Sequence, residues 1–182
     1  MILKNILILS GSPHKNGTSS ALLDRFEEGA RSNGNEVTRR NVAFLNINGC
    51  LGCNNCKINK GICSQVDDFS MIKDDIRESD VVVFATPLYY FGMSAQLKQV
   101  IDRFHSIGDE LKNKKRQTIL ISTQTNPSQE ITKALIDHYK MIINYWGWDI
   151  IDMLIATAVP TLEELIKTDY LEKAKELGKR IS

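Results

Sequence analysis

Three short aliphatic runs constrain the fold of this chain more than any other feature. They are Ile6–Leu9, Val81–Ala85 and Thr118–Ser122. Each run is continuous rather than alternating with polar residues, which is typical of parallel strands covered by helices on both faces. A weaker, alternating run at Glu36–Val42 predicts an edge strand, and a fifth strand is predicted around Trp148–Ala156. The sequence thus predicts five strands.

Amphipathic stretches between these runs predict helices that alternate with the strands. Capping residues support them, for example Asp67-Asp68 before one helix and Pro160-Thr161 before the last. The predicted helices are Ser19–Ser32, Phe69–Glu78, Ser94–Ser106, Ser128–Tyr145 and Leu162–Lys179. Such alternation, in a chain of 182 residues, predicts a single α/β domain covering residues 1–182. Ligands of such sheets bind at the carboxyl ends of the strands, here in the loops after Leu9, Ala85 and Ser122.

Charge and hydropathy exclude several classes of partner. Lys and Arg nearly balance Asp and Glu, giving a formal net charge of +1, which argues against nucleic acid or an anionic membrane as the main partner. No apolar run approaches the ~18–20 residues of a membrane-spanning helix. The apolar N-terminus predicts a buried strand rather than a signal peptide. We therefore expect a cytoplasmic protein that acts on small molecules.

The loop after the first strand, "SGSPHKNGTSSAL", has the composition of a phosphate site. Ser10, Ser12, Thr18 and Ser19 offer hydroxyls, and Gly17 lets the backbone approach a ligand. The helix that follows directs its free amides and positive dipole end into the loop. The spacing matches neither the G-x-G-x-x-G fingerprint nor a P-loop. An ordinary turn with a helix cap is the alternative that the loop alone leaves open.

This loop resembles the "GSPRKxGNT" segment of the flavodoxin-like NAD(P)H-dependent FMN reductases and the related iron–sulfur flavoproteins. His14 stands where that family usually has Arg. The resemblance implies a flavodoxin-like three-layer sandwich with a five-stranded parallel sheet in the order 2-1-3-4-5. It also implies that the loop binds the FMN phosphate, through Ser10, Ser12, His14, Gly17, Thr18 and Ser19.

The loop after the third strand carries the longest match. "ATPLYYFGMSAQLKQVIDR", from Ala85 to Arg103, is similar to the family's "APVYxGxxSxxLKxxIDR" segment. Taken one at a time, its aromatic residues could equally belong to the core. The resemblance implies that Pro87, Leu88, Tyr89, Tyr90, Phe91 and Gly92 contact the flavin ring. In the same family the loop after the fourth strand lies near the flavin, which makes Thr123 and Gln124 further candidates.

All four cysteines lie within fourteen residues, "CLGCNNCKINKGIC", with the spacing C-x2-C-x2-C-x6-C. The compact C-x2-C-x2-C turn is the way ferredoxins offer three thiolates to one iron–sulfur cluster. In a reducing compartment such clusters of thiols indicate metal or redox chemistry more often than structural disulfides. Metal-free thiols, a zinc site and disulfides all remain open. The iron–sulfur flavoproteins bind a [4Fe-4S] cluster with a similar motif, so the resemblance implies Cys50, Cys53, Cys56 and Cys63 as ligands.

The function that the resemblance implies is FMN-dependent NAD(P)H oxidoreduction. NAD(P)H would be a transient co-substrate, and flavin, a quinone or another small molecule would accept the electrons. No catalytic side chain is expected, because the flavin carries the chemistry. The alternative is an iron–sulfur flavoprotein electron carrier that uses FMN and a cluster at the four cysteines. Family members are commonly homodimers or higher homo-oligomers, which we also expect here.

Two other segments carry predictions from the residues alone. Trp146 and Trp148 bracket a glycine near the end of a predicted helix, which indicates a role in packing or in a dimer surface. The basic run Lys112–Arg116 predicts a solvated turn before the fourth strand, and attraction of a nicotinamide phosphate is the alternative.

Overall fold

The structure is a computed structural model that describes residues 3–182. It contains one five-stranded sheet in which every neighbouring pair of strands is parallel, in the order β2-β1-β3-β4-β5. The strands are β1 Asn5–Ser10, β2 Glu36–Asn41, β3 Val81–Pro87, β4 Gln117–Thr123 and β5 Asp149–Ala156. The predicted flavodoxin-like fold and strand order are confirmed, and all five predicted strands are present.

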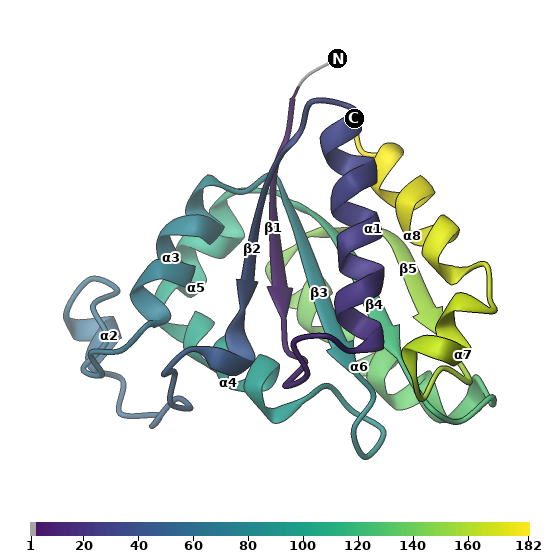
Figure 1. The fold of residues 1–182 in the computed structure, drawn as a ribbon. Coiled ribbons are helices and arrows are strands. Elements are labelled where there is room, and N and C mark those ends of the chain that lie inside the picture. Colours follow the sequence, from purple (N-terminus) through teal and green to yellow (C-terminus); the bar gives the residue numbers. More distant parts are fainter. Residues whose placement is uncertain (1–2) are drawn as a thin grey trace.

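Helices cover both faces of the sheet (Figure 1). The α-helices are α1 Thr18–Ser32, α2 Asn55–Ile58, α3 Phe69–Glu78, α4 Ala95–Arg103, α5 Gly108–Asn113, α6 Lys133–Trp146, α7 Leu162–Ile166 and α8 Tyr170–Lys179. Short 3-10 helices accompany them at η1 Val42–Phe44, η2 Phe104–Ile107 and η3 Glu130–Thr132. Within residues 3–182, no helix is long and apolar enough to cross a membrane.

Alternate residues of the strands face two separate cores. In β3, Val82 and Phe84 pack with α3, α4 and α6 on one face, whereas Val81 and Val83 pack with α1 and α8 on the other. All four side chains are at most 1% exposed, because the strand is covered on both sides. This double burial explains why the sequence shows continuous aliphatic runs.

The helices α1 and α8 pack unusually closely. A Cβ added at Gly178 of α8 would overlap the carbonyl oxygen of Phe26 in α1, and one at Gly29 of α1 would overlap the carbonyl oxygen of Lys175. The two glycines therefore allow the backbones of the helices to touch. Through this contact α1 and α8 together cover the face of the sheet on which Val81 and Val83 lie.

Three predicted helices are shorter or broken in the structure. The helix predicted at Ser94–Ser106 is α4 only from Ala95 to Arg103 and then passes into η2. The helix predicted from Ser128 is preceded by η3 and begins as α6 only at Lys133. Here Gln124 Nε2 donates to the carbonyl oxygens of Asn126 and Ser128, at 2.8 Å each. The side chain of Gln124 thus binds carbonyl groups that would accept backbone hydrogen bonds in a helix.

The predicted C-terminal helix is interrupted between α7 and α8. The Thr168 hydroxyl donates to Leu165 O at 2.7 Å and accepts from Tyr170 N at 3.3 Å. The hydroxyl thus ends one helix and starts the next.

The solvated turn predicted at Lys112–Arg116 is confirmed only in part, because Lys112 and Lys115 are exposed but the segment begins in a helix and ends at a buried residue. Residues 108–113 form α5, and Arg116 is only 3% exposed. Its guanidinium lies 5.0 Å from the ring centroid of Trp148 and donates through Nε to Ile76 O at 3.1 Å. Burial lowers the pKa of Arg116, although Asp80 and Glu110 oppose this effect. Trp146 and Trp148 are core residues, at 7% and 4% exposure.

Candidate functional site

The loop between β1 and α1 lies at the carboxyl end of β1, which pairs with β2 on one side and β3 on the other. Ser12 is 6% exposed, and its Oγ accepts a hydrogen bond from the amide of His14 at 3.3 Å. Gly17 occupies the N-cap of α1 without a side chain to cap the helix. The first-turn amides, together with the hydroxyl of Thr18, are therefore available to a bound anion.

Ser94 joins this loop to the loop after β3. The Ser94 hydroxyl donates to Gly11 O at 2.7 Å and accepts from Leu97 N, which caps α4. The amide of Ser94 in turn donates to Thr86 Oγ1 at 2.8 Å. A Cβ at Gly11 would lie 2.7 Å from Leu97 Cβ, so only glycine permits this close approach. The two loops are consequently fixed relative to each other before any ligand binds.

The loop after β4 is tied to both of the others. Ser19 Oγ in the first turn of α1 lies 2.8 Å from Thr123 Oγ1, and the amide of Leu88 donates to Thr123 O at 2.9 Å. Gln124 is 5% exposed and directs its Nε2 into its own loop, while its Oε1 has no hydrogen-bond partner among the described residues. Thr123 thus holds three loops together, whereas Gln124 shapes one of them.

An open cleft of about 700 Å³ lies above these loops. Of the predicted FMN residues, the cleft is lined by Ser12, His14, Gly17, Thr18, Ser19, Pro87 and Thr123. The segment Pro160–Glu163, after β5, closes its other side and was not among the predicted site residues. The rule that ligands bind at the carboxyl ends of parallel strands could have found this segment.

The remaining predicted FMN residues lie outside this lining. Ser10 is buried at the end of β1, at 2% exposure. Phe91 lines a second open cavity, of about 520 Å³, with residues of η3 and the start of α6. The structure therefore gathers the predicted phosphate residues around one cleft and places the aromatic loop beside it. Those outside the lining are Ser10, Leu88, Tyr89, Tyr90, Phe91, Gly92 and Gln124.

The aromatic loop has an unusual backbone. Tyr89 and Gly92 exchange two backbone hydrogen bonds of 3.0 Å, which closes a two-residue turn. Its central residues, Tyr90 and Phe91, both have positive φ, at 45° and 65°. Turns of this kind normally contain Asn and Gly, because a Cβ makes the left-handed conformation unfavourable. Tyr90 is also fully exposed and Phe91 is 58% exposed, so packing does not account for either aromatic side chain. Strain of this kind often marks a binding site.

The four cysteines lie on a long loop between η1 and α3, and all are free thiols. Cys50 and Cys53 are exposed, while Cys56 and Cys63 are half-buried. Cys53 Sγ lies 3.4 Å from Ser64 Oγ, and this hydrogen bond lowers the pKa of the Cys53 thiol. The described residues 3–182 contain no group of three or more His, Cys, Asp or Glu side chains placed to hold a metal ion. Four thiols are the right number and kind of donors for a [4Fe-4S] cluster, but this structure holds them apart.

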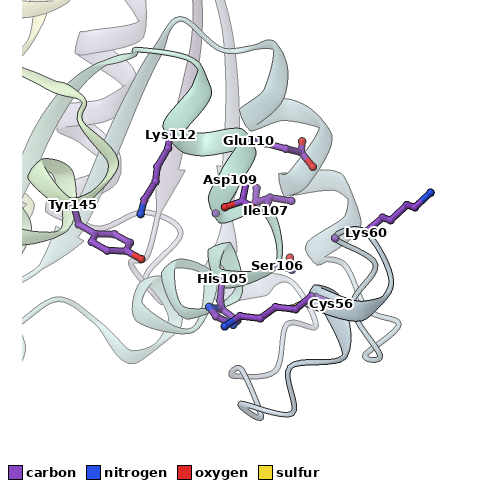
Figure 2. A pocket seen from close by; sticks show the side chains of 12 residues that line it. Cys56, Lys60, His105, Ser106, Ile107, Asp109, Glu110, Lys112 and Tyr145 are labelled. Atoms are coloured by element: carbon purple, nitrogen blue, oxygen red, sulfur yellow. The ribbon is translucent and has the colours of Figure 1, made fainter.

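A separate cleft, of about 400 Å³, lies beside the cysteine loop (Figure 2). Cys56 of α2, His105 of η2, Lys112 of α5 and Tyr145 of α6 contribute to its lining. Lys112 Nζ lies 4.0 Å from the ring centroid of Tyr145, and the two side chains face one end of the opening, whereas Lys60 points away from it. This cleft contains none of the predicted FMN residues.

The geometry agrees with comparisons to known proteins. A family model described as NADPH-dependent FMN reductase matches residues 4–147. The chain belongs to this family. It is an oxidoreductase, and FMN is the cofactor of its family.

Two curated relatives are named iron–sulfur flavoproteins. The protein from Archaeoglobus fulgidus is 31% identical over 94% of this chain and 76% of its own length. The one from Methanocaldococcus jannaschii is 32% identical over 75% of this chain and 72% of its own length. Among solved structures, an NAD(P)H:quinone oxidoreductase from Methanothermobacter marburgensis superposes with a TM-score of 0.78, at 17% identity, and covers 98% of this chain and 96% of its own. At that identity the structural likeness supports the reductase fold alone.

Proposed function

We propose that this FMN reductase family member transfers electrons from NAD(P)H to a small-molecule acceptor, such as free flavin or a quinone, and binds FMN in the 700 Å³ cleft. One observation carries the proposal. An uncapped helix N-terminus and the hydroxyl-rich first loop line the cleft, and a strained, exposed aromatic turn lies beside it. The helix N-terminus and the hydroxyl groups can bind a phosphate monoester, and the aromatic turn can contact a flat aromatic ring.

The cleft fits FMN because of its hydrogen-bonding groups and because hydrogen bonds join the loops that line it. Ser12, Thr18 and the amides at the start of α1 would bind the phosphate, and His14 adds a polar side chain at the rim. The hydrogen bond from Ser94 to Gly11 holds the ring-binding loop against the phosphate loop, and that from Leu88 to Thr123 holds it against the loop after β4. Because these contacts exist without ligand, little ordering is needed on binding.

The bound flavin would supply hydride acceptance and electron transfer, and the side chains bind, orient and expose it. Pro87 stiffens the exit from β3 and has no amide that needs a partner. Full exposure of Tyr90 leaves its ring free to cover a ligand or to meet another molecule. Nicotinamide would reach the flavin from the open side of the cleft, which needs no separate domain.

A single anaerobic experiment tests this function. Protein loaded with FMN is mixed with NADH or NADPH, and loss of the flavin absorption is followed. We expect bleaching by at least one nicotinamide and recovery of absorption when a quinone or free flavin is added. Failure to bind FMN, or binding without reduction by either nicotinamide, would refute the proposal; the second result would indicate a flavin-binding sensor.

The cysteine loop favours a second candidate function, that of an iron–sulfur flavoprotein which exchanges single electrons. Its support is the C-x2-C-x2-C-x6-C spacing and the names of the two curated relatives. Protein prepared without oxygen should then contain iron and acid-labile sulfide in stoichiometric amounts and show visible absorption beyond that of flavin. Flavin bands alone, with no iron after reconstitution, would eliminate this candidate and leave the reductase.

We also propose that the protein forms a homodimer or higher homo-oligomer through the aromatic surface beside the cleft. Tyr90 and Phe91 are exposed there, and Phe44, which lies 5.0 Å from Lys15 Nζ of the first loop, is 46% exposed. Exposed aromatic groups of this kind are enriched in interfaces. Light scattering of the FMN-loaded protein measures the assembly, and a monomer at all concentrations would contradict the proposal.

A further inference from the structure

The cysteine loop is held mainly at its base, although Lys73 Nζ also donates to Gly61 O at 3.0 Å and His105 Nε2 lies 3.3 Å from Asn54 Oδ1. Its two ends lie side by side: Asn46 N donates to Asp68 Oδ2 at 2.8 Å, and Asp68 N donates to Asn46 O at 3.1 Å. Gln65 Nε2 also donates to Gly49 O at 3.0 Å. We call these paired segments, 46–49 and 65–68, the neck. The cysteines all lie beyond it, in residues 50–63.

Arg103, the last residue of α4, reaches into the neck. Its Nη1 donates to Asp67 Oδ2 at 2.6 Å and to Asn48 O at 2.9 Å, and its Nη2 donates to Asp67 Oδ1 at 3.2 Å. Both charged side chains are almost fully buried, at 1% and 3% exposure. Asp67 also accepts hydrogen bonds from the amides of Asn48 and Phe69. Arg103 and Asp67 therefore join the two ends of the loop to each other and to α4.

One donor of Arg103 remains unused. Its Nε is buried and has no hydrogen-bond partner among the described residues. Arg103, Asp67 and Cys63 together line a cavity of about 210 Å³ below the cysteine loop. Burial acts to lower the pKa of Arg103, but Asp67 and, more weakly, Cys63 raise it above its ordinary value. Cys63 is thus the cysteine within the electrostatic reach of the guanidinium.

The other end of α4 belongs to the flavin site. Ser94, its N-cap, donates to Gly11 O in the phosphate loop. The nine residues of α4 rise about 1.5 Å each, so the two ends lie roughly 13 Å apart. One short, rigid element thus contacts the proposed FMN loop at its start and the neck of the cysteine loop at its end.

We propose that Arg103 is a positioning residue for the cysteine loop. Its two Nη groups hold the two segments of the neck together through Asp67 and Asn48, and its free Nε–H is directed to the sulfur of Cys63. The proposal rests on the iron–sulfur candidate for the role of the cysteines. Hydrogen bonds to ligand sulfur stabilise the more reduced state of a cluster and are among the determinants of its potential. The tip of the loop would then rearrange around a cluster while the neck keeps its place.

The competing explanation is that Arg103 and Asp67 form only a stabilising ion pair. Removing one partner leaves a buried charge uncompensated, so single substitutions confuse stability with positioning. The double variant R103M/D67N removes both charges, and the amide oxygen that it introduces at position 67 keeps an acceptor for one of the two backbone amides, of Asn48 or of Phe69, that bind the carboxylate. The matched control is K98M/D102N, which removes an exposed ion pair on the same helix, at 38% and 45% side-chain exposure.

The test uses FMN-loaded protein prepared without oxygen. In R103M/D67N we expect an unchanged affinity for FMN, while amide hydrogen exchange of residues 46–68 accelerates at least ~10-fold, the factor expected when a charged hydrogen bond is lost. Iron and sulfide retained after reconstitution with Fe²⁺ and sulfide should fall several-fold. In R103K, which keeps the charge but loses the fork and Nε–H, any cluster that forms should have a lower reduction potential. K98M/D102N should match the wild type in each measurement.

Three results would overturn the proposal. They are unchanged exchange and iron content in R103M/D67N, an unaltered potential in R103K, and a parallel loss of FMN binding and global stability. If the wild type takes up no iron, the iron–sulfur candidate fails while the exchange measurement still decides whether Arg103 holds the neck.

Discussion

Tyr90 allows a direct test of whether the aromatic turn is strained for function. Its φ of 45° lies in the left-handed region, which costs an L-residue about 1–2 kcal/mol. Because the side chain is fully exposed, replacing it removes no buried surface. Asn adopts this conformation more readily than Tyr. Tyr90→Asn should therefore stabilise the FMN-free protein by about 1 kcal/mol, which corresponds to about 2–4 °C in Tm for a chain of this size.

Tyr90→Ala is the matched control for this prediction. Ala keeps the Cβ that causes the strain but lacks the aromatic ring, so its free energy of unfolding should stay close to that of the wild type. Tyr90→Gly removes the strain but costs about 0.5–1 kcal/mol of additional backbone entropy on folding, so it should fall between the other two. Urea denaturation without FMN gives the order, because bound cofactor would add its own stabilisation.

The same variants separate strain from ligand contact. If the Tyr90 ring covers the flavin, Asn and Ala should weaken FMN binding by a similar factor, about 2–10-fold for the loss of one aromatic contact. Fluorescence quenching of FMN measures this. Equal stabilisation by Ala and Asn would mean that removal of the ring, rather than relief of the backbone, causes the effect, and the argument from strain would be wrong.

Three further predictions concern the first loop and the scaffold. Ser12→Ala should weaken FMN binding about 10–100-fold, as expected for loss of a hydrogen bond to a charged group. The affinity for riboflavin, which has no phosphate, should not change. Equal losses of affinity for both ligands in parallel titrations would contradict a phosphate site here. Gly178→Ala should destabilise the fold by about 1–3 kcal/mol or more, because its Cβ would overlap Phe26 O; an unchanged urea midpoint would show that α1 and α8 can separate freely. Burial acts to raise the pKa of Asp80, but hydrogen bonds from the amide of Asn5 and from Lys114 leave it below its usual value of 3.8. Its contribution to stability is therefore present above that value and lost below it, so the stability difference between the wild type and Asp80→Asn should vanish in urea titrations as the pH falls below about 4.

The sheet could be predicted from sequence because its signals are local. A strand buried on both faces is mostly aliphatic, so β1, β3 and β4 can be recognised as continuous runs in the sequence. The position of the cleft follows from the same runs, because the ends of parallel strands meet at one edge. The loop motifs after Leu9 and Ala85 then indicated which ligand to expect there.

Helix ends were less predictable because they depend on side chains that compete with the backbone. Nothing in the amphipathic pattern of Ser128–Tyr145 shows that Gln124 binds the carbonyl oxygens of Asn126 and Ser128. The burial of Arg116 is a similar case. A lysine-rich run predicts solvent, but this one residue is covered by Trp148, which lies 32 positions away in the sequence.

The ion pair between Arg103 and Asp67 is a feature that the sequence patterns do not predict. The two residues are 36 positions apart, and the sequence pattern around each indicates something else. Arg103 ends the segment that resembles the flavin loop, and Asp67 precedes a predicted helix as a capping residue. A buried ion pair of this kind contributes little to stability compared with apolar residues of the same size. The neck that it closes holds both ends of the cysteine loop, whereas the cysteine side chains themselves are exposed or half-buried. Holding the neck while the tip rearranges is a function that explains why charge is buried here, and R103M/D67N separates it from stability.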